Sequence, residues 1–70
     1  MNSLEMKVTM TRNEDTQEKL AAALGLKISG ISARINGKVD FRASEIEKIR
    51  ARYNLSNDEL VKIFFTSKVS

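Results

Sequence analysis

The stretch Gln17-Glu-Lys-Leu-Ala-Ala-Ala-Leu-Gly-Leu-Lys-Ile-Ser-Gly-Ile-Ser-Ala-Arg-Ile-Asn-Gly37 decides the fold of this chain. Its beginning predicts a short helix, because Leu20 and Leu24 are four residues apart and therefore share one face. Thr16 precedes this helix as a good N-cap, since its hydroxyl accepts a hydrogen bond from an otherwise unpaired backbone N–H. Gly25 follows at the position where helices end in a left-handed residue.

A second apolar stripe after the glycine predicts a second helix. Ile28, Ile31 and Ile35 recur at helical spacing, and Asn36-Gly37 ends the pattern. Two short helices joined by a turn with glycine are typical of the helix-turn-helix, which places its second helix in the DNA major groove. The sequence therefore predicts a helix-turn-helix at about residues 17–37.

The C-terminal half predicts two more helices. Apolar residues at spacings of three and four indicate a helix over about residues 42–53, and Asn54 is suited to end it. Ser56-Asn-Asp-Glu59 is a capping box, the strongest helix start in the chain. It predicts a final helix that extends to about residue 65.

The N-terminal segment fits two structures. Leu4 and Val8 are four residues apart and favour a helix over residues 3–12 with Ser3 as its cap. The apolar side chains of residues 6, 8 and 10 also alternate, which is typical of an extended strand.

The expected fold is all-α, a compact bundle of about five short helices that contains the helix-turn-helix. It forms one domain over residues 1–70, with the ends, residues 1–2 and 67–70, frayed. The expected core consists of apolar residues from all the helices: Leu4, Val8, Leu20, Leu24, Leu26, Ile31, Ile35, Phe41, Ile46, Ile49, Tyr53, Leu60 and Ile63.

Composition argues against several classes of function. The chain has no cysteine and no histidine, so it lacks thiolate chemistry and the commonest general base and zinc ligand. Its longest apolar run, residues 20–24, is too short for a membrane span or a signal peptide. We therefore expect a soluble cytoplasmic protein that is not an enzyme and needs no cofactor, metal or small-molecule ligand.

Positive charge is concentrated around the second helix. The formal net charge is +3, and residues 27–42 contain four basic side chains against Asp40 alone. This is the part of the chain that would meet phosphates in a DNA complex. The charge supports DNA binding, although a basic balance of this size also occurs in proteins that are simply soluble.

The chain resembles the lambda-repressor-like helix-turn-helix family, also called the XRE type, and in particular Cro- and repressor-sized proteins of phages and prophages. The similar residues are Gln17, Leu20, Ala21, Gly25, Ile31, the run Arg34-Ile-Asn-Gly-Lys38 and the ending Asp58-Glu-Leu-Val-Lys-Ile-Phe-Phe65. The resemblance extends over roughly residues 4–65, and it favours helix for the N-terminal segment.

The resemblance implies which residues meet DNA. Side chains at the start and on the outward face of the second helix reach base edges in relatives, and here they are Lys27, Ile28, Ser29, Ser32 and Ala33. The residues expected to contact phosphates are Gln17, Arg34, Asn36, Lys38 and Arg42. Arg34 departs from the pattern, since many relatives are apolar at this position, and it is expected to point outward, near DNA or towards a partner. The base-contacting set lacks the side chains of bidentate readout, which suggests that DNA shape contributes to recognition.

Several residues of this region have alternative roles. Gln17 also fits an ordinary first residue of a helix, and Asn36 an ordinary helix end. Ile28 equally fits a core residue that begins the stripe of Ile31 and Ile35. Gly30 lies inside the helix, where it costs about 1 kcal/mol relative to alanine. It permits a close backbone approach, to DNA or to the first helix, or it has no special role.

Relatives bind DNA as dimers, and the consecutive Phe64 and Phe65 cannot both face one small core. One of the two is therefore expected at a dimer contact, with Val69 in support, which makes Phe64, Phe65 and Val69 the candidate dimer residues. The alternative is that Phe65 only covers the edge of the core. The expected function is a phage or prophage transcriptional regulator that binds double-stranded operator DNA as a homodimer in the bacterial host cell and occludes a promoter. The alternative is a helical protein-interaction module on the same fold that binds an antirepressor or antitoxin-like partner.

Overall fold

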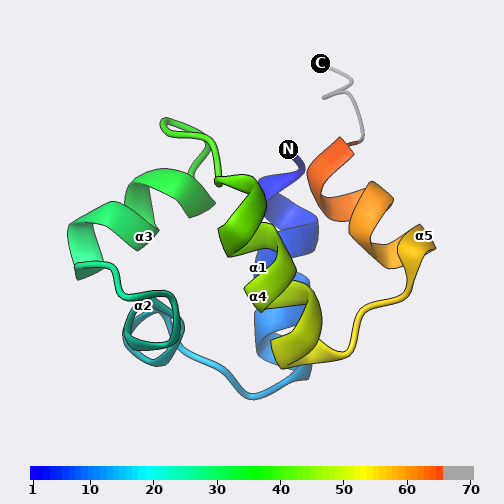
Figure 1. Ribbon diagram of the computed structural model, residues 1–70, viewed down its shortest axis with the longest axis horizontal. Helices are drawn as coiled ribbons and strands as arrows, with labels where there is room; N and C mark the ends of the chain where they lie inside the picture. The colour runs from blue at the N-terminus through cyan, green and yellow to red at the C-terminus, as the bar shows by residue number, and fades with distance from the viewer. Residues whose placement is uncertain (66–70) are drawn as a thin grey trace.

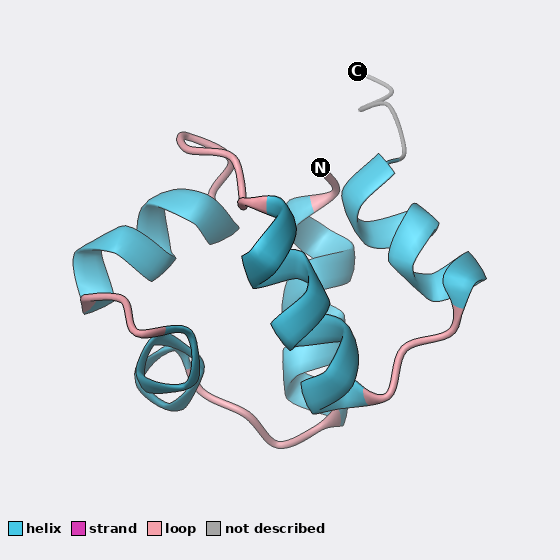
Figure 2. Ribbon diagram, viewed as in Figure 1, coloured by secondary structure: helices cyan, strands magenta, loops and turns pink. Residues whose placement is uncertain are grey.

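A computed structural model describes residues 1–65, and in this part of the chain every regular element is helical (Figures 1 and 2). The elements are α1 (Ser3–Arg12), α2 (Gln17–Leu24), α3 (Ile28–Ile35), α4 (Ala43–Tyr53), α5 (Asn57–Leu60) and η1 (Val61–Phe65), a π-helical turn that continues α5. The predicted all-α fold is confirmed, and the ambiguous N-terminal segment is a helix.

Helices α1 and α4 occupy the middle of the molecule, with α2 and α3 on one side and α5 on the other (Figure 1). The core between them receives side chains from all six elements: Met6, Met10, Leu20, Ala21, Leu24, Ile31, Ile35, Phe41, Ile49, Tyr53, Leu55, Leu60 and Ile63. Leu26 and Ile46, which were expected inside, are only partly buried against this core. None of the helices in residues 1–65 is long and apolar enough to cross a membrane.

The predicted helix ends are confirmed by local hydrogen bonds. The Thr16 hydroxyl accepts a bond of 3.2 Å from the Lys19 N–H, and Gly25 ends α2 in the left-handed conformation with φ of 69°. Ser56 and Glu59 form the reciprocal capping box of α5. Each of these contacts joins residues close in sequence, so they determine α2 and α5 before any packing is considered.

Helix α1 turns a different face to the core from the one expected. Met6, Thr9 and Met10 are buried, whereas Leu4 is 69% exposed and Val8 is also exposed. The pair of Leu4 and Val8 and the pair of Met6 and Met10 both fit a helix, but they begin two residues apart and therefore point about 200° away from each other. The assignment of Leu4 and Val8 to the core is wrong, because only the position of the other helices distinguishes the two faces.

The first residues are tied to the end of the described chain. Asn2, not Ser3, caps α1, because its side chain accepts a hydrogen bond of 3.1 Å from the Glu5 N–H. The Asn2 N–H donates to the Ile63 carbonyl at 2.7 Å, and Met1 packs against the core. Residues 1–2 were expected to fray and instead join α1 to η1. The other predicted frayed end, residues 67–70, lies outside the described residues.

Candidate nucleic-acid interface

After the turn that follows α2, helix α3 packs against the rest of the protein through one of its faces only. The Leu26 N–H donates to the Ala21 carbonyl at 2.8 Å across Gly25, which closes the end of α2. Beyond the turn, Ile31 and Ile35 are fully buried. The opposite face of α3 is therefore available to a ligand, at the edge of the molecule (Figure 1).

Three of the predicted base-contacting residues are brought together at the start of α3. Lys27, Ile28 and Ser29 are exposed, and Ile28 retains 48% of its accessible surface. The alternative core role of Ile28 is therefore wrong. Lys27 is the N-cap residue of α3, but its side chain forms no capping hydrogen bond. The positive end of the helix dipole is therefore not capped by this side chain. Ser32 and Ala33, one turn further on, are half-buried.

The predicted phosphate-contacting residues flank α3. Gln17 is half-buried at the first position of α2, and Asn36, Lys38 and Arg42 are exposed in and after the loop between α3 and α4. In Figure 1, α3 lies between α2 and this loop. The Asn36 amide also lies near Ser32, to whose hydroxyl oxygen it donates at 3.4 Å.

Arg34 is not oriented as expected. Its side chain is only 11% exposed, and its Nε donates to a carboxylate oxygen of Glu45 at 2.9 Å. Its Nη1 donates to the Gly30 carbonyl at 3.1 Å, within the same helix. The prediction that Arg34 points outward is wrong, because the start of α4 supplies a buried carboxylate at this position. Because its guanidinium is held by Glu45, Arg34 is not placed to contact phosphates.

Glu45 receives two hydrogen bonds on one oxygen. Its Oε1 accepts from Arg34 Nε and from the Arg42 backbone N–H at 2.8 Å. Burial raises the pKa of Glu45, but the Arg42 N–H and the guanidinium of Arg34 outweigh it and hold the pKa below its usual value. Glu45 is therefore a carboxylate at neutral pH, and it links the end of α3 to the start of α4.

Comparison with known families identifies this architecture. A family model described as Helix-turn-helix matches residues 11–60, which is fifty of the seventy residues. The chain belongs to this helix-turn-helix family. Its members are DNA-binding regulators of the XRE type. No curated protein and no solved structure matches the chain.

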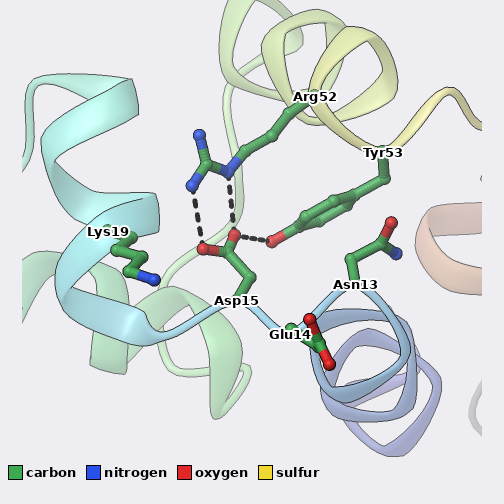
Figure 3. Close-up of a pocket in the computed structure, with 6 residues that line it drawn as sticks. All are labelled: Asn13, Glu14, Asp15, Lys19, Arg52 and Tyr53. Atoms are coloured by element: carbon green, nitrogen blue, oxygen red, sulfur yellow. Dashed lines mark hydrogen bonds and ion pairs between the residues drawn. The ribbon is translucent and has the colours of Figure 1, made fainter.

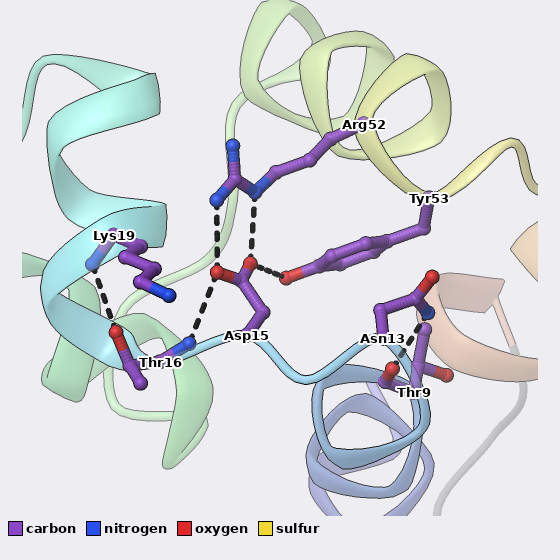
Figure 4. Close-up of polar contacts among 7 residues, drawn as sticks. All are labelled: Thr9, Asn13, Asp15, Thr16, Lys19, Arg52 and Tyr53. Atoms are coloured by element: carbon purple, nitrogen blue, oxygen red, sulfur yellow. Dashed lines mark hydrogen bonds and ion pairs between the residues drawn. The ribbon is translucent and has the colours of Figure 1, made fainter.

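A cluster around Asp15, absent from the sequence-based predictions, supports α2 of this helix-turn-helix protein. Arg52 donates to both carboxylate oxygens of Asp15 at 2.8 Å each, and the Tyr53 hydroxyl donates to the same carboxylate (Figure 3). The Thr16 N–H donates to it at 3.0 Å (Figure 4). The only sequence signal was the polar run of residues 13–15, which indicated a turn without its distant partners.

This cluster shifts the pKa values of its members. The hydrogen bonds from Arg52 lower the pKa of Asp15 strongly, with further contributions from Tyr53 and Thr16, and against the effect of burial. Burial, followed by the hydrogen bond to Asp15, raises the pKa of Tyr53. Neutral Tyr53 and ionised Asp15 are thus the forms present at physiological pH, which suits a structural clamp.

The predicted dimer residues are in different environments. Phe64 is half-buried and packs edge-on against Phe41, with ring centroids 5.6 Å apart. Phe65 retains 64% of its accessible surface. Val69 lies outside the described residues. Of the two phenylalanines predicted to form the dimer contact, Phe65 therefore presents the larger apolar surface.

Proposed function

We propose that the protein is a transcriptional regulator of the phage or prophage Cro and small-repressor type, which binds operator DNA as a homodimer and occludes a promoter. The observation that carries the proposal is the exposed start of α3, with Lys27, Ile28 and Ser29 side by side on a helix whose other face is buried. A helix presented in this way fits the major groove. Membership of a DNA-binding family supports the same conclusion.

Base recognition in this proposal uses the exposed face of α3. Lys27 donates to guanine or to a phosphate, and Ser29 bonds to more than one base edge. Ile28 and Ala33 contact thymine methyl groups, while Ser32 lies on the same helix close to the Asn36 amide. This set offers few bidentate contacts, so the sequence dependence of DNA shape provides a share of the specificity.

The position of the protein along the DNA is set by contacts to the phosphate backbone of the DNA. Gln17 at the start of α2, together with Asn36, Lys38 and Arg42 beside the other end of α3, contacts phosphates on both sides of the groove. Such contacts orient α3 without reading sequence. They also make the affinity fall steeply with salt, because each neutralised phosphate releases counterions.

The size of one module is compatible with a dimer on DNA. The longest dimension of the molecule is 29 Å, so two copies side by side match half-sites separated by about 34 Å, one turn of DNA. Phe65 is exposed and provides an apolar contact between the two copies, together with its neighbour Phe64 and with Val69. A dimer of this kind covers a promoter and excludes polymerase.

The test is fluorescence anisotropy with a duplex from immediately upstream of the gene and a scrambled duplex of equal length, between about 50 and 200 mM salt. We expect at least a tenfold preference for the first duplex. Ser29→Glu should lower this affinity about tenfold or more, because it places a carboxylate beside the phosphates. Ala51→Glu, an equally charged change at an exposed position of α4, serves as the control.

Two results would contradict the proposal. Intact binding by Ser29→Glu would show that α3 does not enter the groove. A complete lack of DNA binding at low salt would favour the protein-interaction module, for which an antirepressor or antitoxin-like partner would then be sought. Sedimentation equilibrium tests the dimer separately: we expect two copies of the 7.9 kDa chain per duplex, and weaker assembly by Phe65→Ser.

A further inference from the structure

We infer that Glu45 determines DNA specificity without touching DNA: it positions α3 relative to the phosphate-contacting residues and keeps the Arg34 charge from binding phosphates. This inference rests on the proposed function, since it concerns the same surface. It assigns a role to two residues that are buried behind that surface rather than part of it.

The positioning role follows from the shared oxygen. Glu45 Oε1 lies 2.9 Å from Arg34 Nε, near the end of α3, and 2.8 Å from the backbone nitrogen of Arg42, just before α4. Residues 36–42 form the whole connection between these helices, and they include the cations Lys38 and Arg42. One carboxylate therefore closes this connection at both ends and fixes where its cations lie relative to α3.

A bond within α3 fixes the other end of the Arg34 side chain, so the bond to Glu45 also fixes the orientation of α3. Arg34 Nη1 donates to the Gly30 carbonyl at 3.1 Å, one turn earlier in α3. A Cβ at position 30 would lie 3.4 Å from Nη1, which is an ordinary van der Waals contact, so this bond does not depend on the glycine. The guanidinium is thus bonded to α3 and to α4 at once. Rotation of α3 about its axis would break the charge-assisted bond between Arg34 and Glu45, whose side chains are mostly buried, and such bonds are stronger there than in water.

The charge role follows from burial. The side chains of Arg34 and Glu45 are 11% and 9% exposed, so the two charges neutralise each other within the protein. Of the four basic residues in 27–42, the three that remain for phosphates are Lys27, Lys38 and Arg42. An unmasked Arg34 would add a phosphate contact on any DNA sequence. Non-specific affinity would rise, while specific affinity would fall with the loss of register.

The test compares Glu45→Gln with Glu47→Gln, its matched control on the exposed side of α4, because both raise the net charge by one. The probes are a duplex recovered by in vitro selection with the wild-type protein and a scrambled duplex, measured by anisotropy over about 50–200 mM salt. For Glu45→Gln we expect a fall of about tenfold in the ratio of the two affinities. We also expect the salt slope, which is the slope of the logarithm of the binding constant against the logarithm of the salt concentration, to steepen on scrambled DNA. The expected change is about 0.9, the value of one additional phosphate contact. Glu47→Gln should have a much smaller effect on both the affinity ratio and the salt slope.

Arg34→Met is the second variant, and it keeps the inference falsifiable if Glu45→Gln does not fold. It should weaken binding to the selected duplex and leave the salt slope unchanged. A slope reduced by about 0.9 would show that Arg34 itself contacts a phosphate and would overturn the inference. So would identical behaviour of Glu45→Gln and Glu47→Gln.

The failure of the proposed function gives a different result. If selection recovers no preferred sequence, sequence-specific regulation is wrong, but the slopes on scrambled DNA still decide whether Glu45 masks Arg34. If the wild-type protein binds no DNA at 50 mM salt, both proposals are overturned together.

Discussion

Asp15 and Arg52, which are 37 positions apart in the sequence, form a two-point ion pair with both nitrogen–oxygen distances at 2.8 Å. Asp15 immediately precedes the cap of α2, and Arg52 lies at the end of α4. At the start of the same helix, Glu45 binds Arg34 of α3. Helix α4 therefore supports the helix-turn-helix at both of its ends: Arg52 binds Asp15, just before α2, and Glu45 binds Arg34 of α3.

The Asp15 cluster should contribute measurably to stability. Asp15→Asn is expected to lower the free energy of unfolding by about 2 kcal/mol, because it removes charge-assisted hydrogen bonds from Arg52. Tyr53→Phe keeps the packed ring and loses one hydrogen bond, so about 1 kcal/mol is expected. Urea unfolding followed by circular dichroism measures both. Glu14→Gln, the same charge change at an exposed neighbour, is the control, and an equal effect of Asp15→Asn and Glu14→Gln would contradict the clamp.

The effect of Asp15→Asn should depend on pH. Because the pKa of Asp15 in the folded protein lies below its usual value of 3.8, the unfolded chain binds more protons in acid. The stabilisation is therefore complete above this value and is lost as the pH falls below it. Unfolding free energies of the wild type and of Asp15→Asn should differ at pH 7 and converge towards pH 2. A difference that stays constant over this range would show that the charge of Asp15 is not involved.

The buried face of α1 gives a prediction with an internal control. Met6→Ala should lower the free energy of unfolding by about 2–5 kcal/mol, because Met6 is fully buried and its removal leaves a cavity. Leu4→Ala removes a side chain that is mostly exposed and should cost less than about 0.5 kcal/mol. Thermal unfolding compares them directly. The reverse order would place Leu4 in the core and require a different rotation of α1.

Two glycines should respond in opposite directions to alanine. Gly25 has φ of +69° and open space within 4 Å of where a Cβ would lie, so Gly25→Ala is strained by its backbone alone and should cost about 1 kcal/mol. Gly30 is helical, and its Cβ would be in ordinary contact with the movable end of Arg34. Gly30→Ala should therefore raise the free energy of unfolding by up to about 1 kcal/mol. Loss of stability in Gly30→Ala would show that Arg34 cannot adjust.

Much of the fold was predictable because its causes are local. Thr16 caps the N–H of Lys19, three residues away, and Asn54 ends α4 in the left-handed conformation with φ of 52°. The capping box of Ser56 and Glu59 is equally local. Such contacts form within a single turn, so the residue types and their spacing are sufficient to identify them.

The candidate site was predictable to the extent that it depends on periodicity. Ile31 and Ile35 define the buried face of α3, so the exposure of Lys27 and Ser29 follows from the helical repeat. Ile28 lies at the margin of that stripe, and its position depends on how closely α2 and its neighbours cover the first turn. The structure exposes it.

The sequence by itself determined the helices, their ends and the order of the helix-turn-helix, because these follow from interactions between residues no more than one or two turns apart. Only the tertiary structure decided that Met6 rather than Leu4 enters the core, that Arg34 turns inward to Glu45, and that Asp15 meets Arg52. Each of these choices depends on a partner from another helix. An amphipathic pattern shows that a face will be buried, whereas the identity of that face and the pairing of a charge are set by the surface that packs against it.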